Sequence, residues 1–93
     1  NINKIIFAYE PVWSIGTSKI PSKGELKNTI KFIKSECKKI FKTKKVPRVL
    51  YGGSVNHKNI QLFSTIYAID GFLIGGASQS SKKFIDIIKN YYK

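Results

Sequence analysis

The stretch Phe7–Thr17, F-A-Y-E-P-V-W-S-I-G-T, contains the features that decide the fold. A short apolar run ends on one carboxylate, Glu10, and Pro11 interrupts the strand immediately afterwards. A loop follows, with an aromatic residue, Trp13, near its start and a glycine, Gly16, at its tip. We therefore expect Glu10 to be a base at the end of a rigid strand, followed by a loop that can act as a lid.

Strand and helix patterns alternate along the rest of the chain. The apolar run Lys4–Tyr9 is typical of a strand that is buried on both faces of a parallel sheet. Ser22 and Glu25 have the spacing of a capping box and predict a helix from Lys23 to Phe41. The apolar stripe of this helix is predicted to consist of Leu26, Ile30, Ile33, Cys37 and Ile40.

The second half of the chain continues the same alternation. Residues 48–51 and 70–74 are expected to be strands, and residues 56–65 a short helix. A last helix is expected to begin at Ser80 or Ser81. Its predicted apolar positions are Phe84, Ile85, Ile87, Ile88 and Tyr91. Three strands separated by helices predict an α/β fold with a parallel sheet and right-handed crossovers.

Two glycine pairs follow the second and third predicted strands directly. The first reads Tyr51-Gly52-Gly53-Ser54 and the second Gly75-Gly76-Ala77-Ser78. A lone glycine pair is a weak signal, but two pairs at equivalent strand ends, each followed by serine, indicate a backbone cradle for phosphate. Backbone N–H dipoles can supply the positive potential of such a cradle, so no lysine or arginine is required there.

Composition limits the possible classes of protein. The net charge of +12 raises the possibility of nucleic-acid binding, but sixteen of the seventeen basic residues are lysine and only Arg48 is arginine. The abundance of lysine, isoleucine and asparagine is typical of A/T-rich codons, so we expect solvated lysines and no nucleic-acid partner. The single cysteine, Cys37, excludes an internal disulfide and makes a reducing, cytoplasmic compartment the default expectation. No run of apolar residues is long enough to predict a membrane span.

Taken together, the strand-end motifs resemble the C-terminal part of the triosephosphate isomerase family over nearly all 93 residues. The resemblance implies a TIM (β/α)8 barrel of which residues 1–93 would form one partial domain, strands 6–8 with their helices. A whole barrel needs about 250 residues. Because the chain contains no methionine, we also expect that Asn1 is not a translation start and that the front part of the barrel is missing.

The family resemblance implies roles for individual residues. Glu10 would be the base that moves a proton between C1 and C2 of a triose phosphate, in a family that is a standard example of a base closed off by a loop. Gly16, Ser54, Gly75 and Gly76 would bind the substrate phosphate. The lid hinges would be Pro11, Val12 and Trp13 on one side and Lys19, Ile20 and Pro21 on the other. The resemblance also implies glycolytic and gluconeogenic isomerisation of dihydroxyacetone phosphate and glyceraldehyde 3-phosphate, a homodimer in the intact protein, and neither a metal nor an organic cofactor.

Three positions depart from the family pattern. Ser18 replaces the second glycine of the lid tip, and Pro21 lacks the N–H that often meets the loop tyrosine, here Tyr51. Lys34 stands where an arginine commonly pairs with the acid that opens the last strand, here Asp70. Lysine can form that pair without a bidentate fork, or it can be solvated without a partner.

Some alternatives remain open. The only histidine, His57, is expected to be a surface residue within the short helix, and Cys37 a small core residue. The chain could be a non-catalytic phosphate-binding half-barrel in which Glu10 is incidental, or a basic nucleic-acid-binding domain. The isolated fragment is expected to be unstable or to aggregate, and to be inactive, because the catalytic histidine and other family residues lie outside it.

Overall fold

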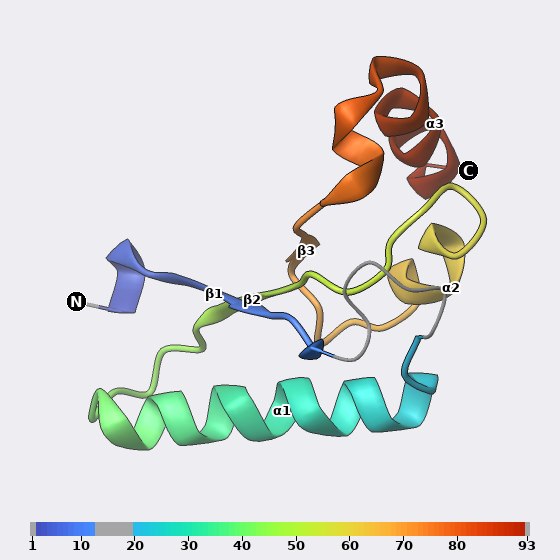
Figure 1. The fold of residues 1–93 in the computed structure, drawn as a ribbon. Coiled ribbons are helices and arrows are strands. Elements are labelled where there is room, and N and C mark those ends of the chain that lie inside the picture. Colours follow the sequence, from blue (N-terminus) through green and yellow to red (C-terminus); the bar gives the residue numbers. More distant parts are fainter. Residues whose placement is uncertain (1, 13–19, 93) are drawn as a thin grey trace.

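A computed structural model describes residues 2–12 and 20–92 as a three-stranded parallel sheet with helices on its two sides (Figure 1). The strands are β1 (Ile6–Tyr9), β2 (Arg48–Tyr51) and β3 (Gly71–Phe72), in the spatial order β1-β2-β3. A short 3-10 helix, η1 (Ile2–Lys4), precedes β1. The predicted parallel sheet is therefore confirmed.

The register of the sheet brings the ends of the three strands to one edge. Ile6 pairs with Arg48 and Tyr9 with Tyr51, while Tyr51 also pairs with Phe72 on the other side. In a parallel sheet the carboxyl ends of neighbouring strands lie side by side. The segments that follow Tyr9, Tyr51 and Phe72 consequently emerge next to one another.

Strand β1 is less buried than the sequence predicts. Its residues alternate between exposed and half-buried, and the Ile6 side chain is 58% exposed. The strand is shorter than the predicted 4–9 because residues 2–4 form η1. Within the described sheet β1 has a neighbour on one side only, and this edge position explains why its apolar residues remain accessible.

Helix α1 (Lys23–Ile40) covers one face of the sheet, along which it runs in Figure 1. The Ser22 hydroxyl oxygen accepts a hydrogen bond from the Glu25 N–H at 3.2 Å, so the predicted N-cap is confirmed. The stripe residues Leu26, Ile30 and Cys37 are buried. Ile33 is half-buried and packs against the core, whereas Ile40 is 72% exposed because it lies in the last turn, after which the chain reverses direction.

Helix α2 (Ile60–Ser64) begins later than the predicted residue 56. The Asn56 side-chain oxygen accepts hydrogen bonds from the N–H groups of Lys58 and Asn59, and the Asn59 side-chain oxygen accepts one from the Asn56 N–H. These bonds fold residues 56–59 into a turn in place of the first helical turn. His57 therefore lies in this turn and not in the helix, although it is exposed as predicted.

The third strand is shorter than the predicted 70–74, since only Gly71 and Phe72 form β3. Backbone hydrogen bonds from Asp70 N–H to Val49 and from Leu73 N–H to Tyr51 continue the pairing at either end. A 3-10 helix that the sequence did not predict, η3 (Gly76–Gln79), follows the strand. Here the chain bends before α3 begins.

Helix α3 (Ser81–Tyr91) has Ser80 as its N-cap, one of the two predicted caps. Of its five predicted apolar positions only Ile87 is buried; the others, Phe84, Ile85, Ile88 and Tyr91, are 37–47% exposed. The reason is that α3 packs against η3 and α2 and leaves much of its apolar surface uncovered. A hydrogen bond from Lys82 lowers the pKa of Asp86, one turn further along α3, below its ordinary value.

The core lies where α1, the sheet and α2 meet. Tyr51 and Phe63 are fully buried, and their ring centroids are 4.8 Å apart. Leu26 and Ile30 of α1, Val49 of β2, Ile60 of α2 and Ile87 of α3 complete the centre of this cluster. No helix within residues 2–12 and 20–92 combines the length and apolar character that crossing a bilayer requires.

Candidate active site

The candidate site is built at the edge where the three strands end. The Gly52 N–H donates to the Tyr9 carbonyl at 2.9 Å, which places Gly52 beside the residue that precedes Glu10. The Leu73 N–H donates to the Tyr51 carbonyl at 3.0 Å and places the end of β3 beside β2. Polar and glycine-rich segments that are up to 66 residues apart in sequence are thus brought together by the pairing of the strands.

A cavity of about 510 Å³ occupies this edge. Its volume lies in the range of small-molecule sites, roughly 300–1,000 Å³. Both predicted glycine pairs line it, together with the candidate base; the shared lining includes Glu10, Gly52, Gly53, Ser54, Gly75 and Gly76. The structure therefore brings together all of the predicted base and phosphate residues that it describes.

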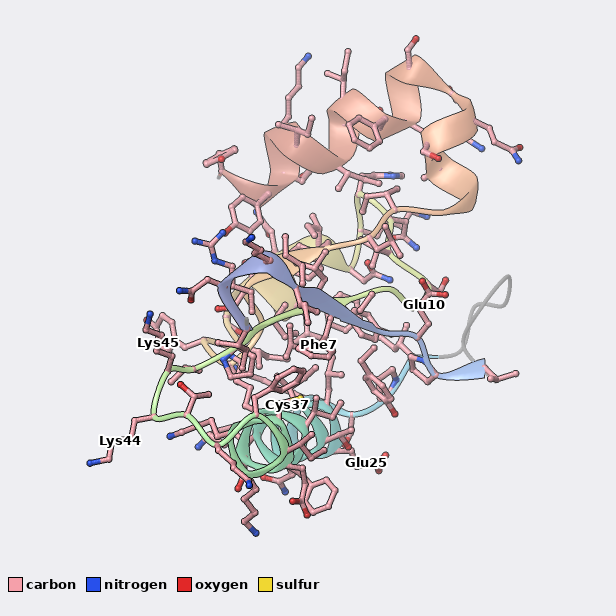
Figure 2. The ribbon with its side chains drawn as sticks, turned by 90° about the vertical axis from the view of Figure 1, so that its left-hand side faces the viewer. Phe7, Glu10, Glu25, Cys37, Lys44 and Lys45 are labelled. Atoms are coloured by element: carbon pink, nitrogen blue, oxygen red, sulfur yellow. The ribbon has the colours of Figure 1, made fainter. Side chains whose placement is uncertain are left out.

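Glu10 lies against the backbone of Gly52. A Cβ atom built on Gly52 would come within 2.7 Å of the Glu10 Cγ and 3.3 Å of its Oε1. Such a contact is too short for any side chain, so glycine is required for Glu10 to lie where it does. Figure 2 shows the Glu10 carboxylate on the side of the sheet opposite α1. Glu10 is exposed, and its carboxylate can meet a ligand in the cavity.

The two glycine segments offer backbone donors to the same cavity. The Asn59 side-chain amide donates to the Ser54 carbonyl at 2.7 Å, which holds the loop after β2. In the described part of the chain, the N–H groups of Gly75 and Gly76 donate to no other protein group. A Cβ atom on either glycine would meet nothing within 4 Å, so the space next to their backbone is open. Two free N–H groups beside open space suit an anionic oxygen.

Three cationic or titratable residues that the sequence did not predict as site residues also line the cavity: His57, Lys58 and Lys83. Lys58 and His57 reach it because residues 56–59 form a turn and not a helix. Lys83 reaches it because the Ser80 side chain caps α3 and fixes the direction of its first turn. The signal available in the sequence was their position four to seven residues after each glycine pair.

The predicted hinges of the lid are described in part. Pro11 and Pro21 are buried, Ile20 packs against the core, and Val12 is 84% exposed. Trp13, Gly16 and Lys19, together with Ser18, lie outside the described residues.

The remaining singled-out residues have defined places. The Lys34 ammonium lies 2.9 Å from the Asp70 carboxylate, so the paired alternative is the one observed. The same Asp70 oxygen accepts a hydrogen bond from the Val49 N–H at 2.8 Å. Cys37 is a buried free thiol, as predicted. Within residues 2–12 and 20–92 no group of three or more histidine, cysteine or acidic side chains could hold a metal ion.

The chain is similar to known proteins over almost its whole length. The family model for triosephosphate isomerase matches residues 1–91. Triosephosphate isomerase from Borreliella burgdorferi is 42% identical over 92 residues, which cover 97% of this chain and 36% of the relative. The protein of the same name from Mycoplasmopsis agalactiae is 46% identical over 88 residues, 95% of this chain and 32% of the relative. That from Chlamydia abortus is 38% identical over 91 residues, 96% of this chain and 36% of the relative.

The chain spans about a third of the length of these curated relatives. A match of the family model to residues 1–91 covers both glycine pairs and the segment around Glu10. The parallel sheet, with the candidate motifs at the carboxyl ends of its strands, agrees with part of a TIM barrel. The chain belongs to the triosephosphate isomerase family.

Proposed function

We propose that this chain carries the base and the phosphate cradle of a triosephosphate isomerase, which interconverts dihydroxyacetone phosphate and D-glyceraldehyde 3-phosphate. The observation that supports this most directly is the shared cavity, in which Glu10 lies against Gly52 and faces the same space as Ser54, Gly75 and Gly76. The names of the relatives and the family match give the reaction class.

In this proposal residues 1–93 form one partial domain and β1, β2 and β3 are strands 6–8 of a (β/α)8 barrel. The order of three parallel strands, each followed by a helix, supports the assignment. Barrels of this kind commonly bind phosphate with the loops of their last two strands. The glycine pairs after β2 and β3 occupy the corresponding places.

In the proposed mechanism one part of the cavity binds the phosphate and another part transfers the proton. The N–H groups of Ser54, Gly75 and Gly76 hold the phosphate, and the ammonium groups of Lys58 and Lys83 add positive charge beside it. Glu10 takes the proton from C1 and returns it at C2 through an enediolate. Closure of the segment between Pro11 and Pro21, with Gly16 at the phosphate, would exclude water and strengthen the carboxylate as a base.

This chemistry requires neither a metal ion nor an organic cofactor, because Glu10 and an electrophile outside this chain perform the proton transfers. We propose that the intact enzyme is a cytoplasmic homodimer without a nucleic-acid or membrane partner. The isolated 93-residue chain is proposed to be inactive, because it spans only about a third of the length of the curated relatives.

The decisive experiment places this chain in the matching segment of the Borreliella burgdorferi relative and measures isomerase turnover. The chimera should be active, and Glu10→Gln should lower kcat by about 10²–10⁴-fold, the usual contribution of a general base. Binding of inorganic phosphate should remain nearly unchanged. The matched control is Glu36→Gln on α1, which does not line the cavity and should leave kcat unchanged.

The same experiment tests the alternative of a non-catalytic phosphate-binding half-barrel. That alternative predicts an inactive chimera whose phosphate binding does not depend on Glu10. An active chimera that retains its turnover after Glu10→Gln would contradict the proposed role of Glu10.

A further inference from the structure

Positive charge is concentrated in one quarter of the chain. Residues 23–45, which comprise α1 and the loop after it, contain nine lysines and only two glutamates, Glu25 and Glu36. Neither the predicted base nor the predicted phosphate cradle lies in this segment. The concentration therefore has no explanation in the proposed isomerase site.

Four of these lysines follow one flank of α1. Lys27, Lys31, Lys34 and Lys38 are spaced by four, three and four residues, so their side chains leave the helix on the same side. Like charges at this spacing destabilise a helix. Lys34 is compensated by Asp70, but Lys31 and Lys38 form no ion pair with any residue of the described chain. Among the described residues, the repulsion along this flank is thus balanced by a counter-charge at Lys34 and not at Lys31 or Lys38.

A hollow of about 430 Å³ lies over this flank at the end of α1. Four lysines line it, together with two hydroxyl-bearing residues and one apolar residue: Lys31, Lys34, Lys38, Lys39, Ser35, Thr43 and Val46. It shares no lining residue with the cavity beside Glu10.

Several parts of the hollow are held in place by other bonds. Lys34 is only 14% exposed in its side chain and is fixed by Asp70 at 2.9 Å. The Thr43 N–H donates to the Lys38 carbonyl at 3.1 Å, and the Thr43 hydroxyl accepts from the Lys45 N–H. The turn between Lys38 and Thr43 includes Lys42, whose φ is positive at 49°. The loop is therefore folded back onto the helix end and forms one wall of the hollow.

We propose that this hollow binds a small anion that carries several phosphate groups, of the inorganic polyphosphate class. The ammonium groups of Lys31 and Lys38 are free of ion pairs with described residues, whereas Lys34 and Lys39 are paired with Asp70 and Glu36. Two unpaired ammonium groups and two hydroxyls around one space complement a multivalent anion, and lysine binds phosphate as a point charge. No aromatic residue lines the hollow, so it offers no surface on which a nucleobase could stack. This composition favours a polyphosphate over a nucleic acid.

The test measures binding of sodium tripolyphosphate by calorimetry, with inorganic phosphate as the comparison that carries a single phosphate group. Both the full 93-residue chain and the chimera serve as carriers, so that aggregation of the free chain does not prevent the measurement. The double variant K31Q/K38Q should weaken tripolyphosphate binding by about tenfold or more, because it removes the two uncompensated charges. Isomerase activity of the chimera should not change, since neither lysine lines the other cavity.

The matched control is K44Q/K45Q, which removes the same charge from the same segment. Figure 2 shows Lys44 and Lys45 on the loop after α1, and neither lines the hollow. This control should change the affinity by less than about twofold if the hollow is the site. Equal weakening by both double variants would show a general effect of net charge and would overturn the proposal.

Two further outcomes would also overturn it. Loss of tripolyphosphate binding with Lys83→Gln but not with K31Q/K38Q would place the anion in the cavity beside Glu10. Tighter binding of a single-stranded oligothymidylate than of tripolyphosphate, with a steep dependence on salt, would identify the surface as a nucleic-acid site.

Discussion

Gly52 leaves the space that the Glu10 side chain occupies. Its backbone is covered by the Glu10 side chain, and a Cβ atom would lie 2.7 Å from the Glu10 Cγ. Gly52→Ala should displace the carboxylate without disturbing the core, since Glu10 is free to move toward solvent. We expect kcat of the chimera to fall by about 10²-fold, the cost of a misplacement of about 1 Å.

A matched control for this substitution is available in α1. Gly24→Ala adds a methyl group where nothing lies within 4 Å, so it should leave turnover unchanged. Melting temperatures of both variants should remain close to that of the parent. If Gly52→Ala retained full turnover, the present position of Glu10 would not be the one used in the reaction.

Lys83 allows the contribution of side-chain charge to phosphate binding to be tested separately from that of the backbone N–H groups. Lys83 lines the cavity, whereas its neighbour Lys82 is bonded to Asp86 at 2.9 Å and does not. Lys83→Gln should raise KM for the triose phosphate by about two- to fivefold, as expected for an exposed charge. It should also reduce the dependence of KM on salt, while kcat stays nearly constant.

Lys82→Gln is the control, because it removes the same charge from the adjacent position. Equal changes of KM in the two variants would mean that the net charge of α3, and not the place of Lys83, affects substrate binding.

At the scale of elements, Asp70 connects α1 to the sheet. One oxygen accepts from the Val49 N–H at 2.8 Å and lies 2.9 Å from the Lys34 ammonium. In the chimera Asp70→Asn should lower the free energy of unfolding by about 1.5–3 kcal/mol, since the Val49 N–H exchanges a charged acceptor for a neutral one and the half-buried Lys34 ammonium loses its counter-charge. Lys34→Ala should cost less, about 1 kcal/mol or below, because the Val49 bond remains.

Urea unfolding at neutral pH measures both effects. Asp86→Asn is the matched comparison, since it breaks an ion pair with Lys82 on the exposed surface of α3 and should leave the unfolding midpoint unchanged. A loss at Asp86 as large as that at Asp70 would contradict a special role for the link between α1 and β2.

The elements that could be predicted from sequence are those with local signals. Ser22 and Glu25 determine where α1 begins, and the apolar run 48–51 before a glycine pair predicts β2 with the observed bounds. The bounds of α2 and the burial of α3 depend on interactions that the spacing of apolar residues along the sequence does not reveal. The asparagine turn at residues 56–59 replaces the start of one helix, and the bend at η3 decides which side of α3 meets α2.

The same distinction applies to the site. Glu10 and the glycine pairs were predictable because strand ends in a parallel sheet converge whatever the loops do. The places of Lys58 and Lys83 were not predictable. Whether these side chains line the cavity depends on the asparagine turn and on the direction of α3. The lid residues Trp13, Gly16 and Lys19 stay predictions.

At the scale of the whole molecule, the sheet and α3 both present uncovered apolar surface. Strand β1 has its free edge beside Ile6, which is 58% exposed, and α3 exposes Ile85 and Ile88 by 47% and 44%. An unpaired strand edge next to exposed apolar residues is a template for association with another chain. In a complete barrel this edge would be paired with a further strand.

We therefore expect the 93-residue chain alone to self-associate and to show no isomerase turnover. Light scattering after gel filtration should give a mass that increases with concentration, well above that of the monomer. Ile6→Lys should reduce this association, because a lysine on an edge strand opposes pairing with a second edge. Phe32→Lys on the exposed side of α1 is the control, since Phe32 is 64% exposed but far from the strand edge in sequence and on another element. A monomer at all concentrations that unfolds cooperatively and turns over triose phosphate would contradict this expectation, and would mean that three strands and their helices can complete the site without the rest of a barrel.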